Sequence, residues 1–188
     1  MTGGADAPRR APRPIVLVGL RGVGKTSVAS CLARRLGLGC IDLDECIRWA
    51  CSDACCGERA PSVAEIVTSR GWDGFRDVEE RELRRVIESG ATVVLAAGGG
   101  VVERAENRAL LRARATCVWL RQEVEVLRAR LAADPHARPS LTGADPLREL
   151  DEVARGRERL YAEVAAHSID CGGDAPEALA DRIARLLA

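Results

Sequence analysis

Residues 19–26, GLRGVGKT, form the stretch of sequence that decides the fold. This stretch matches the pattern GxxxxGK[ST], and it follows a continuous apolar run at Ile15–Val18. After it, a helical pattern extends from Lys25 to Leu36. A strand, a glycine-rich loop and a helix in this order are the context in which the pattern binds nucleotide phosphates. We call residues 19–26 the phosphate loop, and it predicts a nucleoside triphosphate site.

Each residue type in the phosphate loop has a physical reason to be there. Glycines let backbone N–H groups approach phosphate oxygens without obstruction by side chains, and the helix N-terminus adds a favourable dipole. We expect Lys25 to bridge the β- and γ-phosphates and the Thr26 hydroxyl to ligate Mg²⁺. The absence of a guanine-reading NKxD-like motif favours ATP over GTP. The predicted ATP-binding residues of the loop and its helix are Gly22, Val23, Gly24, Lys25, Thr26 and Ser27.

Around the phosphate loop, short apolar runs alternate with helical patterns, which predicts a parallel sheet covered on both faces. The predicted class is α/β, a three-layer α/β/α fold of the P-loop type with a central five-stranded parallel sheet. The expected strands are 15–18, 40–44, 92–96, 116–120 and 168–171. The expected helices are 25–36, 62–69, 75–89, one ending near 114, 123–131, 147–165 and 175–187, with no regular structure over 45–60. Ligands of such sheets bind beyond the carboxyl ends of the strands.

Composition excludes several classes of protein. The chain has 188 residues, enough for one domain with a buried core. Its 28 basic and 28 acidic residues balance, which argues against a nucleic-acid-binding protein. No apolar run approaches the ~18–20 residues that span a bilayer, and the N-terminus lacks the apolar segment of a signal peptide. We therefore expect a cytoplasmic protein without membrane association, with a disordered leader at residues 1–14.

The chain contains eight cysteines, an unusual number for a protein of this kind. Because the sequence shows no export signal and has the apolar pattern of an ordinary core, we expect reduced thiols rather than disulfides. Four of the cysteines are close together, but their spacing is not the C-x₂-C pairing that is typical of structural zinc sites. These four are Cys46, Cys51, Cys55 and Cys56.

Five further motifs follow the phosphate loop. They are IDLD at 41–44, GFRDVEE at 74–80, AGGGVV at 97–102, RPSLTG at 138–143 and RERLYAEVA at 157–165. With the loop, and in this order, they resemble the shikimate kinases, which are P-loop small-molecule kinases similar to the nucleoside monophosphate kinases. The resemblance covers about residues 15–171. It implies ATP-dependent phosphorylation of the 3-hydroxyl of shikimate, which gives shikimate 3-phosphate and ADP in aromatic amino acid biosynthesis.

The resemblance also implies roles in an acceptor site. A ligand with one carboxylate and several hydroxyls needs cations for the carboxylate, and the guanidinium fork of arginine matches a carboxylate bidentately. Arg76 and Arg157 would bind that carboxylate, while Asp44 would orient the attacking hydroxyl and accept its proton. Backbone N–H groups of the triple glycine would face the ring. The implied substrate-binding residues are Asp44, Arg76, Gly98, Gly99, Gly100 and Arg157.

A metal site and a lid complete the expected machinery. By resemblance, Asp42 lies near Mg²⁺, so the metal-binding residues are Thr26 and Asp42. Residues 132–147 lack an apolar period and are rich in proline, which predicts a mobile lid that excludes water on closure. Arg138 in this lid would reach the γ-phosphate, so the catalytic residues are Lys25, Asp44 and Arg138. We expect one kinase domain at residues 15–188, with a substrate-binding segment at about 45–89, acting as a monomer on ATP and shikimate.

Simpler interpretations of the same residues stay open. Asp44 could be a helix cap, and Arg76 or Arg138 could be ordinary solvated charges. Arg157 is one of several arginines on its helix, and the triple glycine could be a plain turn. The stretch from 47 to 66 is longer than in the family, which leaves open a different small hydroxy acid or a nucleotide as acceptor. A binding module without catalysis is the third alternative.

Overall fold

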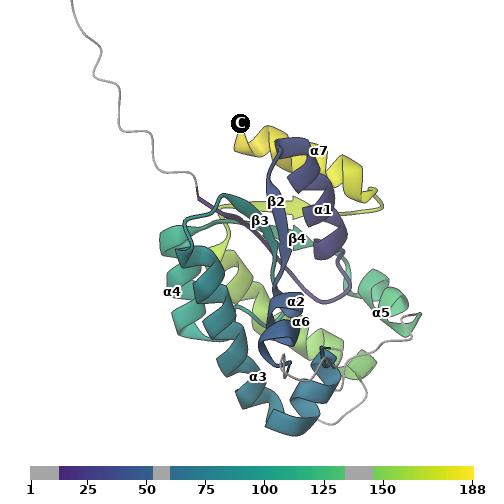
Figure 1. The fold of residues 1–188 in the computed structure, drawn as a ribbon. Coiled ribbons are helices and arrows are strands. Elements are labelled where there is room, and N and C mark those ends of the chain that lie inside the picture. The colour runs from purple at the N-terminus through teal and green to yellow at the C-terminus, as the bar shows by residue number, and fades with distance from the viewer. Residues whose placement is uncertain (1–12, 53–59, 134–145) are drawn as a thin grey trace, which may run out of the picture.

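The computed structural model describes residues 13–52, 60–133 and 146–188 of the chain. Within these residues, helices cover both faces of one five-stranded sheet (Figure 1). The strand order is β2-β3-β1-β4-β5, and all four neighbouring pairs are parallel. The predicted α/β class, with three layers around a central five-stranded parallel sheet, is confirmed.

The strand at the centre of the sheet carries the phosphate loop. The strands are β1 (Ile15–Val18), β2 (Gly39–Asp42), β3 (Val93–Ala96), β4 (Thr116–Arg121) and β5 (His167–Asp170). The helices are α1 (Lys25–Leu36), α2 (Leu43–Ala50), α3 (Val63–Glu88), α4 (Ala105–Arg114), α5 (Val124–Ala132), α6 (Pro146–Val164) and α7 (Pro176–Leu187). In β1, Val16 lies between Leu95 of β3 and Cys117 of β4. The loop therefore begins at the middle of the carboxyl edge of the sheet, where ligands of such folds bind.

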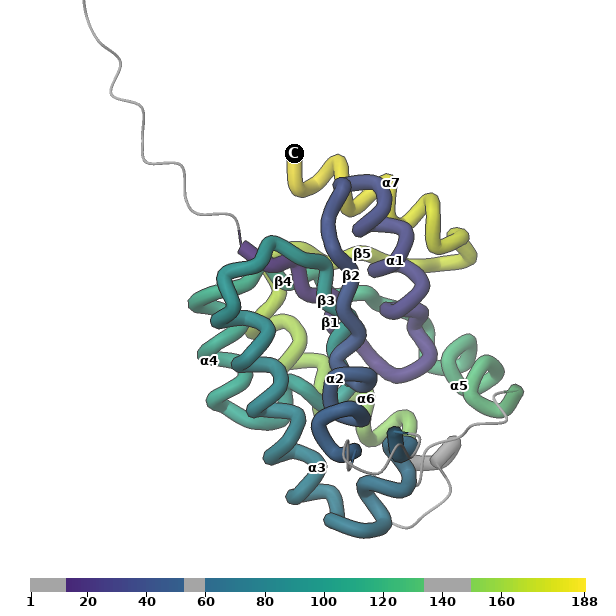
Figure 2. The backbone as a smooth tube through the Cα atoms, in the orientation of Figure 1, coloured from purple at the N-terminus to yellow at the C-terminus, as the bar shows by residue number. Residues whose placement is uncertain are grey.

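Buried apolar side chains form one cluster on each face of the sheet. Val16 and Val18 belong to the cluster under α3 and α4, whereas Ile15 and Leu17 belong to the cluster under α1 and α7. The alternation follows from the period of two along a strand. Figure 2 shows α1 and α7 together on one side and α3 and α4 on the other. Because burying a side chain of this size contributes about 1.5–3 kcal/mol, the two clusters fix the sheet and the loops at its edge.

The chain after β2 differs from the sequence prediction. A strand was expected to extend to residue 44, with irregular structure over 45–60, but β2 ends at Asp42 and α2 begins at the next residue. The buried face of α2 consists of Leu43 and Ile47, four residues apart. Two buried positions are a short helical signal, polar and cysteine residues surround them, and the large apolar residue Trp49 is exposed, so the prediction was wrong here.

A bend divides α3 where the sequence predicted two separate helices, 62–69 and 75–89. Gly71 has φ 69° and ψ 173°, a conformation that is available to glycine without strain. Ser62 and Glu65 form a capping box that begins the first half. The second half carries Arg76 back toward the sheet, where its side chain is buried.

Some predictions concern residues outside the described ranges. These are the leader up to residue 12, residues 53–59 of the cysteine-rich stretch, and residues 134–145 of the expected lid, with Arg138 among them. Among the described residues, no helix combines the length and apolarity needed to cross a bilayer. The six cysteines in this part of the chain are free thiols, and they are Cys31, Cys40, Cys46, Cys51, Cys117 and Cys171.

Candidate active site

The phosphate loop forms a cradle between β1 and α1. Gly22 and Gly24 have φ angles of 81° and 97°, which favour glycine, and Gly24 caps the N-terminus of α1. Gly19 approaches β4 so closely that a Cβ would lie 2.5 Å from the Leu120 carbonyl oxygen. The loop is thus held against the sheet with the first N–H groups of α1 unpaired by the helix. This arrangement binds anions.

Lys25 folds back over the cradle. Its Nζ donates to the Gly19 carbonyl at 2.9 Å and to the Leu20 carbonyl at 2.8 Å. Both acceptors belong to the loop itself, so the ammonium group lies against the cradle rather than on the outer surface of α1. A point charge held there complements a polyphosphate.

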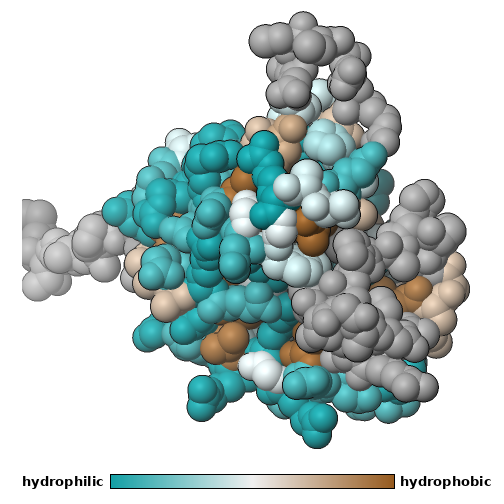
Figure 3. Space-filling view, turned by 90° about the horizontal axis from the view of Figure 1, so that it is seen from below, coloured by the Kyte–Doolittle hydropathy of each residue, from teal (hydrophilic) through white to brown (hydrophobic). Residues whose placement is uncertain are grey.

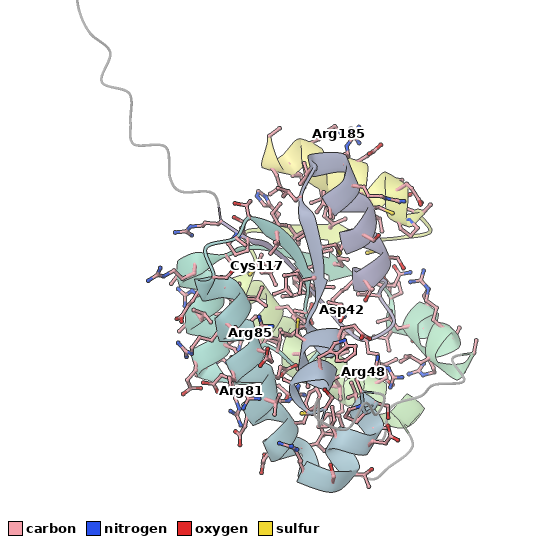
Figure 4. The ribbon with its side chains drawn as sticks, viewed as in Figure 1. Asp42, Arg48, Arg81, Arg85, Cys117 and Arg185 are labelled. Carbon is pink, nitrogen blue, oxygen red and sulfur yellow. The ribbon has the colours of Figure 1, made fainter. Side chains whose placement is uncertain are left out.

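Asp42 connects the phosphate loop with α2. One carboxylate oxygen accepts a hydrogen bond from the Thr26 hydroxyl at 2.7 Å, and the other accepts from the Asp44 backbone N–H at 2.9 Å. The second bond is the N-cap of α2, so the capping role falls to Asp42 and not to Asp44. Figure 4 shows Asp42 where β2 meets α2. The Asp44 side chain is thereby left in the first turn of α2, beside the loop.

A cavity of about 270 Å³ joins these elements. Its lining consists of Arg21, Gly22, Gly24, Lys25, Thr26, Asp42, Asp44, Ala97, Gly98 and Gly99. Of the predicted ATP-binding residues, Val23 and Ser27 are outside this lining, because Val23 is buried in the core and Ser27 is exposed on α1. A larger cavity of about 580 Å³ is lined mainly by β4, α5 and α6, and neither Lys25 nor Asp44 lines it. Viewed from below, the surface is mostly hydrophilic with small separate apolar areas (Figure 3).

Gly98, Gly99 and Gly100, which we call the glycine turn, follow β3 at the same edge of the sheet. A Cβ on Gly98 would lie 2.6 Å from Glu79 Oε1 and 3.5 Å from Asp44 Oδ1. A Cβ on Gly100 would overlap the Arg76 guanidinium. Glycine is therefore required at these two positions because charged side chains approach the backbone closely. The turn is also tied to α6, since the buried Tyr161 hydroxyl donates to the Gly99 carbonyl.

Arg76 on α3 is buried and held from several sides. Its Nη1 donates to Glu79 Oε2 at 2.7 Å, one helical turn away, and its Nη2 lies 2.9 Å from Glu103 Oε2. The rings of Trp72 and Phe75 each lie 5.5 Å from its Cζ, within the range of cation–π contacts. The interpretation of Arg76 as a solvated surface charge is therefore wrong.

Arg157 on α6 reaches the glycine turn from the opposite side. Its Nε donates to Glu103 Oε1 at 2.9 Å, its Nη2 contacts the same oxygen, and its Nη1 donates to the Gly99 carbonyl at 3.2 Å. The helical register therefore directs Arg157 inward, and its residue is only 8% exposed. We call Arg76 and Arg157 the arginine pair, because the Glu103 carboxylate bridges them.

Carboxyl groups are as prominent as guanidinium groups around the turn. Burial raises the pKa of the Glu79 carboxyl above its ordinary value, and the Arg76 guanidinium opposes that rise. The charges of Asp44 and Glu103 raise the pKa further. Glu79 Oε1 is buried and accepts no hydrogen bond from the described residues. This part of the site is therefore poorly suited to an additional carboxylate unless one of its own is displaced.

Two residues of this arrangement escaped the sequence analysis. Glu103 lies three positions beyond the glycine turn, and no spacing rule relates it to Arg76 or Arg157. Tyr161 packs against Trp119, but its hydroxyl also holds the turn. Its place one helical turn after Arg157 was the only available signal.

The sequence of this chain is similar to those of known shikimate kinases. A family model described as "Shikimate kinase" matches residues 21–188. A shikimate kinase from Nitratidesulfovibrio vulgaris (strain Hildenborough) is 44% identical over 179 residues, which cover 93% of this chain and 95% of the relative. Shikimate kinase 2 of Yersinia pseudotuberculosis serotype O:3 is 39% identical over 175 residues, covering 92% of this chain and 94% of the relative.

The fold of this chain is also similar to that of a solved shikimate kinase. The shikimate kinase from Acinetobacter baumannii, solved in complex with shikimate, superposes with a TM-score of 0.84 at 32% identity. The superposition covers 94% of this chain and 93% of that one. The similarity therefore extends over nearly the whole length of both chains.

Proposed function

This chain belongs to the shikimate kinase family and is an ATP-dependent kinase that phosphorylates shikimate; we propose how its residues divide that task. The observation that carries the proposal is the 270 Å³ cavity, which Lys25 and Thr26 share with Asp44 and with Gly98 and Gly99 of the glycine turn. A phosphoryl group bound in the cradle and a hydroxyl bound beside Asp44 would be neighbours there. Such proximity supplies much of the acceleration in phosphoryl transfer.

The nucleotide side of the site consists of the phosphate loop and the start of α1. The backbone N–H groups of Gly22, Val23, Gly24, Thr26 and Ser27 would hold the phosphates at the N-terminus of α1. Lys25 would leave its two carbonyl acceptors and pair with the β- and γ-phosphates. Arg138, outside the described residues, would add charge over the γ-phosphate from the proposed lid at 132–147.

The acceptor side consists of Asp44, the glycine turn and the arginine pair. Arg76 and Arg157 would bind the shikimate carboxylate, and Gly98, Gly99 and Gly100 would let the ring approach the backbone. Asp44 would accept a hydrogen bond from the 3-hydroxyl and take its proton as the oxygen bonds to the γ-phosphorus. The bond between that phosphorus and the β–γ bridging oxygen breaks, and ADP leaves with the bridging oxygen.

A magnesium ion fits the pair formed by Thr26 and Asp42. Their oxygens are hydrogen-bonded to each other at 2.7 Å, and hydroxyl and carboxylate oxygens are the hard ligands that Mg²⁺ prefers. Two protein ligands suffice because Mg²⁺ usually keeps several waters and binds substrate phosphates. When bound, the ion would neutralise charge on the β- and γ-phosphates.

Domain organisation and location complete the proposal. Residues 15–188 would form one kinase domain, in which about 45–89 bind the acceptor and 132–147 close over the nucleotide. The chain would act as a monomer. We place the reaction in the cytoplasm, since a chain with eight cysteines and no disulfide among those described suits a reducing compartment.

The function is tested by coupled ADP release with Mg²⁺-ATP and a panel of acceptors. Shikimate should give acceptor-dependent turnover of about 1–100 s⁻¹, and phosphorus NMR should locate the new ester on the 3-hydroxyl. Quinate and nucleoside monophosphates are the comparison acceptors. The assignment is wrong if shikimate releases no more ADP than a reaction without acceptor, or if a nucleotide is the better substrate.

Gly100→Ala tests the arginine pair without touching a charged residue. The added Cβ overlaps the Arg76 guanidinium, which Glu79 and two aromatic rings hold in place. Because displacement costs a charge-assisted hydrogen bond of ~1.5–3 kcal/mol, the KM for shikimate should rise roughly tenfold to hundredfold. Steady-state kinetics with each substrate varied in turn should show a smaller effect on the KM for ATP.

Gly156→Ala is the matched control for that substitution. Gly156 precedes Arg157 on α6, is exposed, and an added Cβ there meets nothing within 4 Å. Alanine in a helix is more stable than glycine by roughly 0.5–1 kcal/mol, so thermal unfolding should shift upward slightly with unchanged kinetics. If Gly100→Ala behaves like this control, the close approach of Arg76 has no role in acceptor binding.

A further inference from the structure

The Glu103 carboxylate holds the place that an anionic substrate group would take. One of its oxygens lies 2.9 Å from Arg76 Nη2, and the other accepts from Arg157 Nε at 2.9 Å and from Nη2 of the same side chain. A carboxylate that bridges two guanidinium groups in this way satisfies the geometry for which arginine pairs are suited. The chain therefore supplies, from its own sequence, a carboxylate of the same chemical class as the group to be bound.

Hydrogen bonds hold the Glu103 backbone, whereas its side chain is partly exposed beside the two guanidinium groups. Its N–H donates to the Gly100 carbonyl at 3.0 Å, and its carbonyl accepts from Arg108 at 2.9 Å. The side chain is 38% exposed, whereas that of Glu79 is fully buried. Glu103 can therefore turn into solvent by side-chain rotation alone once its ion pairs with Arg76 and Arg157 break. Glu79 has no such route.

Each arginine of the pair also has contacts that do not involve Glu103. Arg76 has a second ion pair with Glu79 and lies against the rings of Trp72 and Phe75. Arg157 also donates to the Gly99 carbonyl, which Tyr161 holds. Both arginines are buried, so these other contacts help to hold their orientation. Removal of the Glu103 charge would leave each guanidinium group with these other contacts and without its bridging carboxylate.

We propose that Glu103 is an internal competitor for the arginine pair, which occupies the carboxylate subsite until shikimate displaces it. The inference rests on the proposed function, because it takes the arginine pair to be the acceptor's carboxylate subsite. Two carboxylates cannot share the bridging position, because their like charges repel at close range and both would need the same guanidinium N–H groups. The observed affinity for shikimate is then the intrinsic affinity reduced by the fraction of molecules in which Glu103 has moved away. Glu103 thereby sets acceptor affinity and weakens binding of ligands that lack an anion to displace it.

Glu103→Gln is the direct test, because it removes the charge and keeps the shape. The dissociation constant for shikimate, measured by calorimetry, should fall roughly threefold to tenfold, since a partly exposed pair of this kind is worth less than a buried one. Glu103→Ala, which removes the whole competing group, should change it in the same direction. Glu106→Gln is the control: it removes the same charge three residues on, from an exposed side chain without an ion pair to the described residues, and should change the constant less than about twofold.

The outcomes separate this inference from the function on which it rests. Wild-type protein that shows no shikimate-dependent ADP release contradicts the proposed function itself. If the wild-type protein turns over shikimate but both Glu103 variants bind it with unchanged or lower affinity, the function stands and the competitor role is overturned. A higher dissociation constant for shikimate in the variants would show that Glu103 supports the arginine pair. Tighter binding in both variants, with Glu106→Gln like wild type, supports the proposal.

Discussion

Asp44→Asn is expected to lower kcat for shikimate phosphorylation by about 10²–10⁴-fold, the usual contribution of a positioned general base. Asn has the same shape and still accepts a hydrogen bond, so the acceptor should bind, but it cannot take the proton of the attacking hydroxyl. The Asp44 backbone N–H, which anchors the start of α2, is unchanged by the substitution. The effect should therefore fall on kcat, with a much smaller change in the KM for shikimate, as measured by steady-state ADP release.

Glu45→Gln is the matched control for Asp44→Asn. Glu45 is the next residue on α2, but its carboxylate forms a solvent-exposed ion pair with Arg48. Exposed pairs of this kind contribute about 0–1 kcal/mol, so the control should unfold near the wild-type temperature and keep its kinetics. If Asp44→Asn retains kcat within about fivefold of wild type, Asp44 only orients the hydroxyl and proton transfer follows another route.

The two substitutions also separate charge from position. Both remove one negative charge from the first turn of α2, and the helix dipole favours negative charge there in each case. Any loss common to both variants is therefore a helix or field effect. Only the excess loss in Asp44→Asn reports on the chemistry at the cavity.

The parts of the molecule that could be predicted from sequence depend on local spacing. The phosphate loop specifies strand, turn and helix within a dozen residues, because the φ angles of Gly22 and Gly24 favour glycine whatever lies around them. Alternating apolar runs and helical patterns then determine the parallel sheet. Asp42 and Asp44 could be assigned to the carboxyl edge for the same reason, although which of them caps α2 depended on where β2 ends.

The rest depends on contacts between residues far apart in sequence. Glu103 meets Arg157 across 54 positions, and Tyr161 meets Gly99 across 62. No local pattern encodes such pairs, because they arise only when α6 and the glycine turn pack on the same edge of the sheet. The sequence marks Gly98 and Gly100 as unusual. Glycine is needed there because Glu79 and Arg76 approach the backbone, and only the folded chain shows that approach.

Lys25→Met is expected to lower kcat by about 10²–10³-fold, the cost of removing one preorganised charge from a transition state of this kind. Lys25 is the single lysine among the chain's 28 basic residues; all the others are arginine. A compact ammonium group can enter the cradle and reach two phosphates, whereas a planar guanidinium is wider and directional. Lys25→Arg should therefore lose most of the activity too, although it keeps the charge.

The single lysine gives this prediction a second readout. An amine-acylating reagent can modify only Lys25 and the N-terminal amine, so ATP should protect activity from the reagent while shikimate should not. Calorimetry should show that Lys25→Met still binds shikimate, since the lysine contacts loop carbonyls and not the arginine pair. Wild-type kcat in Lys25→Arg would mean that charge alone suffices in the cradle. Full activity in Lys25→Met would mean that the backbone N–H groups bind the phosphates without it, and the ammonium group seen against Gly19 and Leu20 would then serve only to hold the loop.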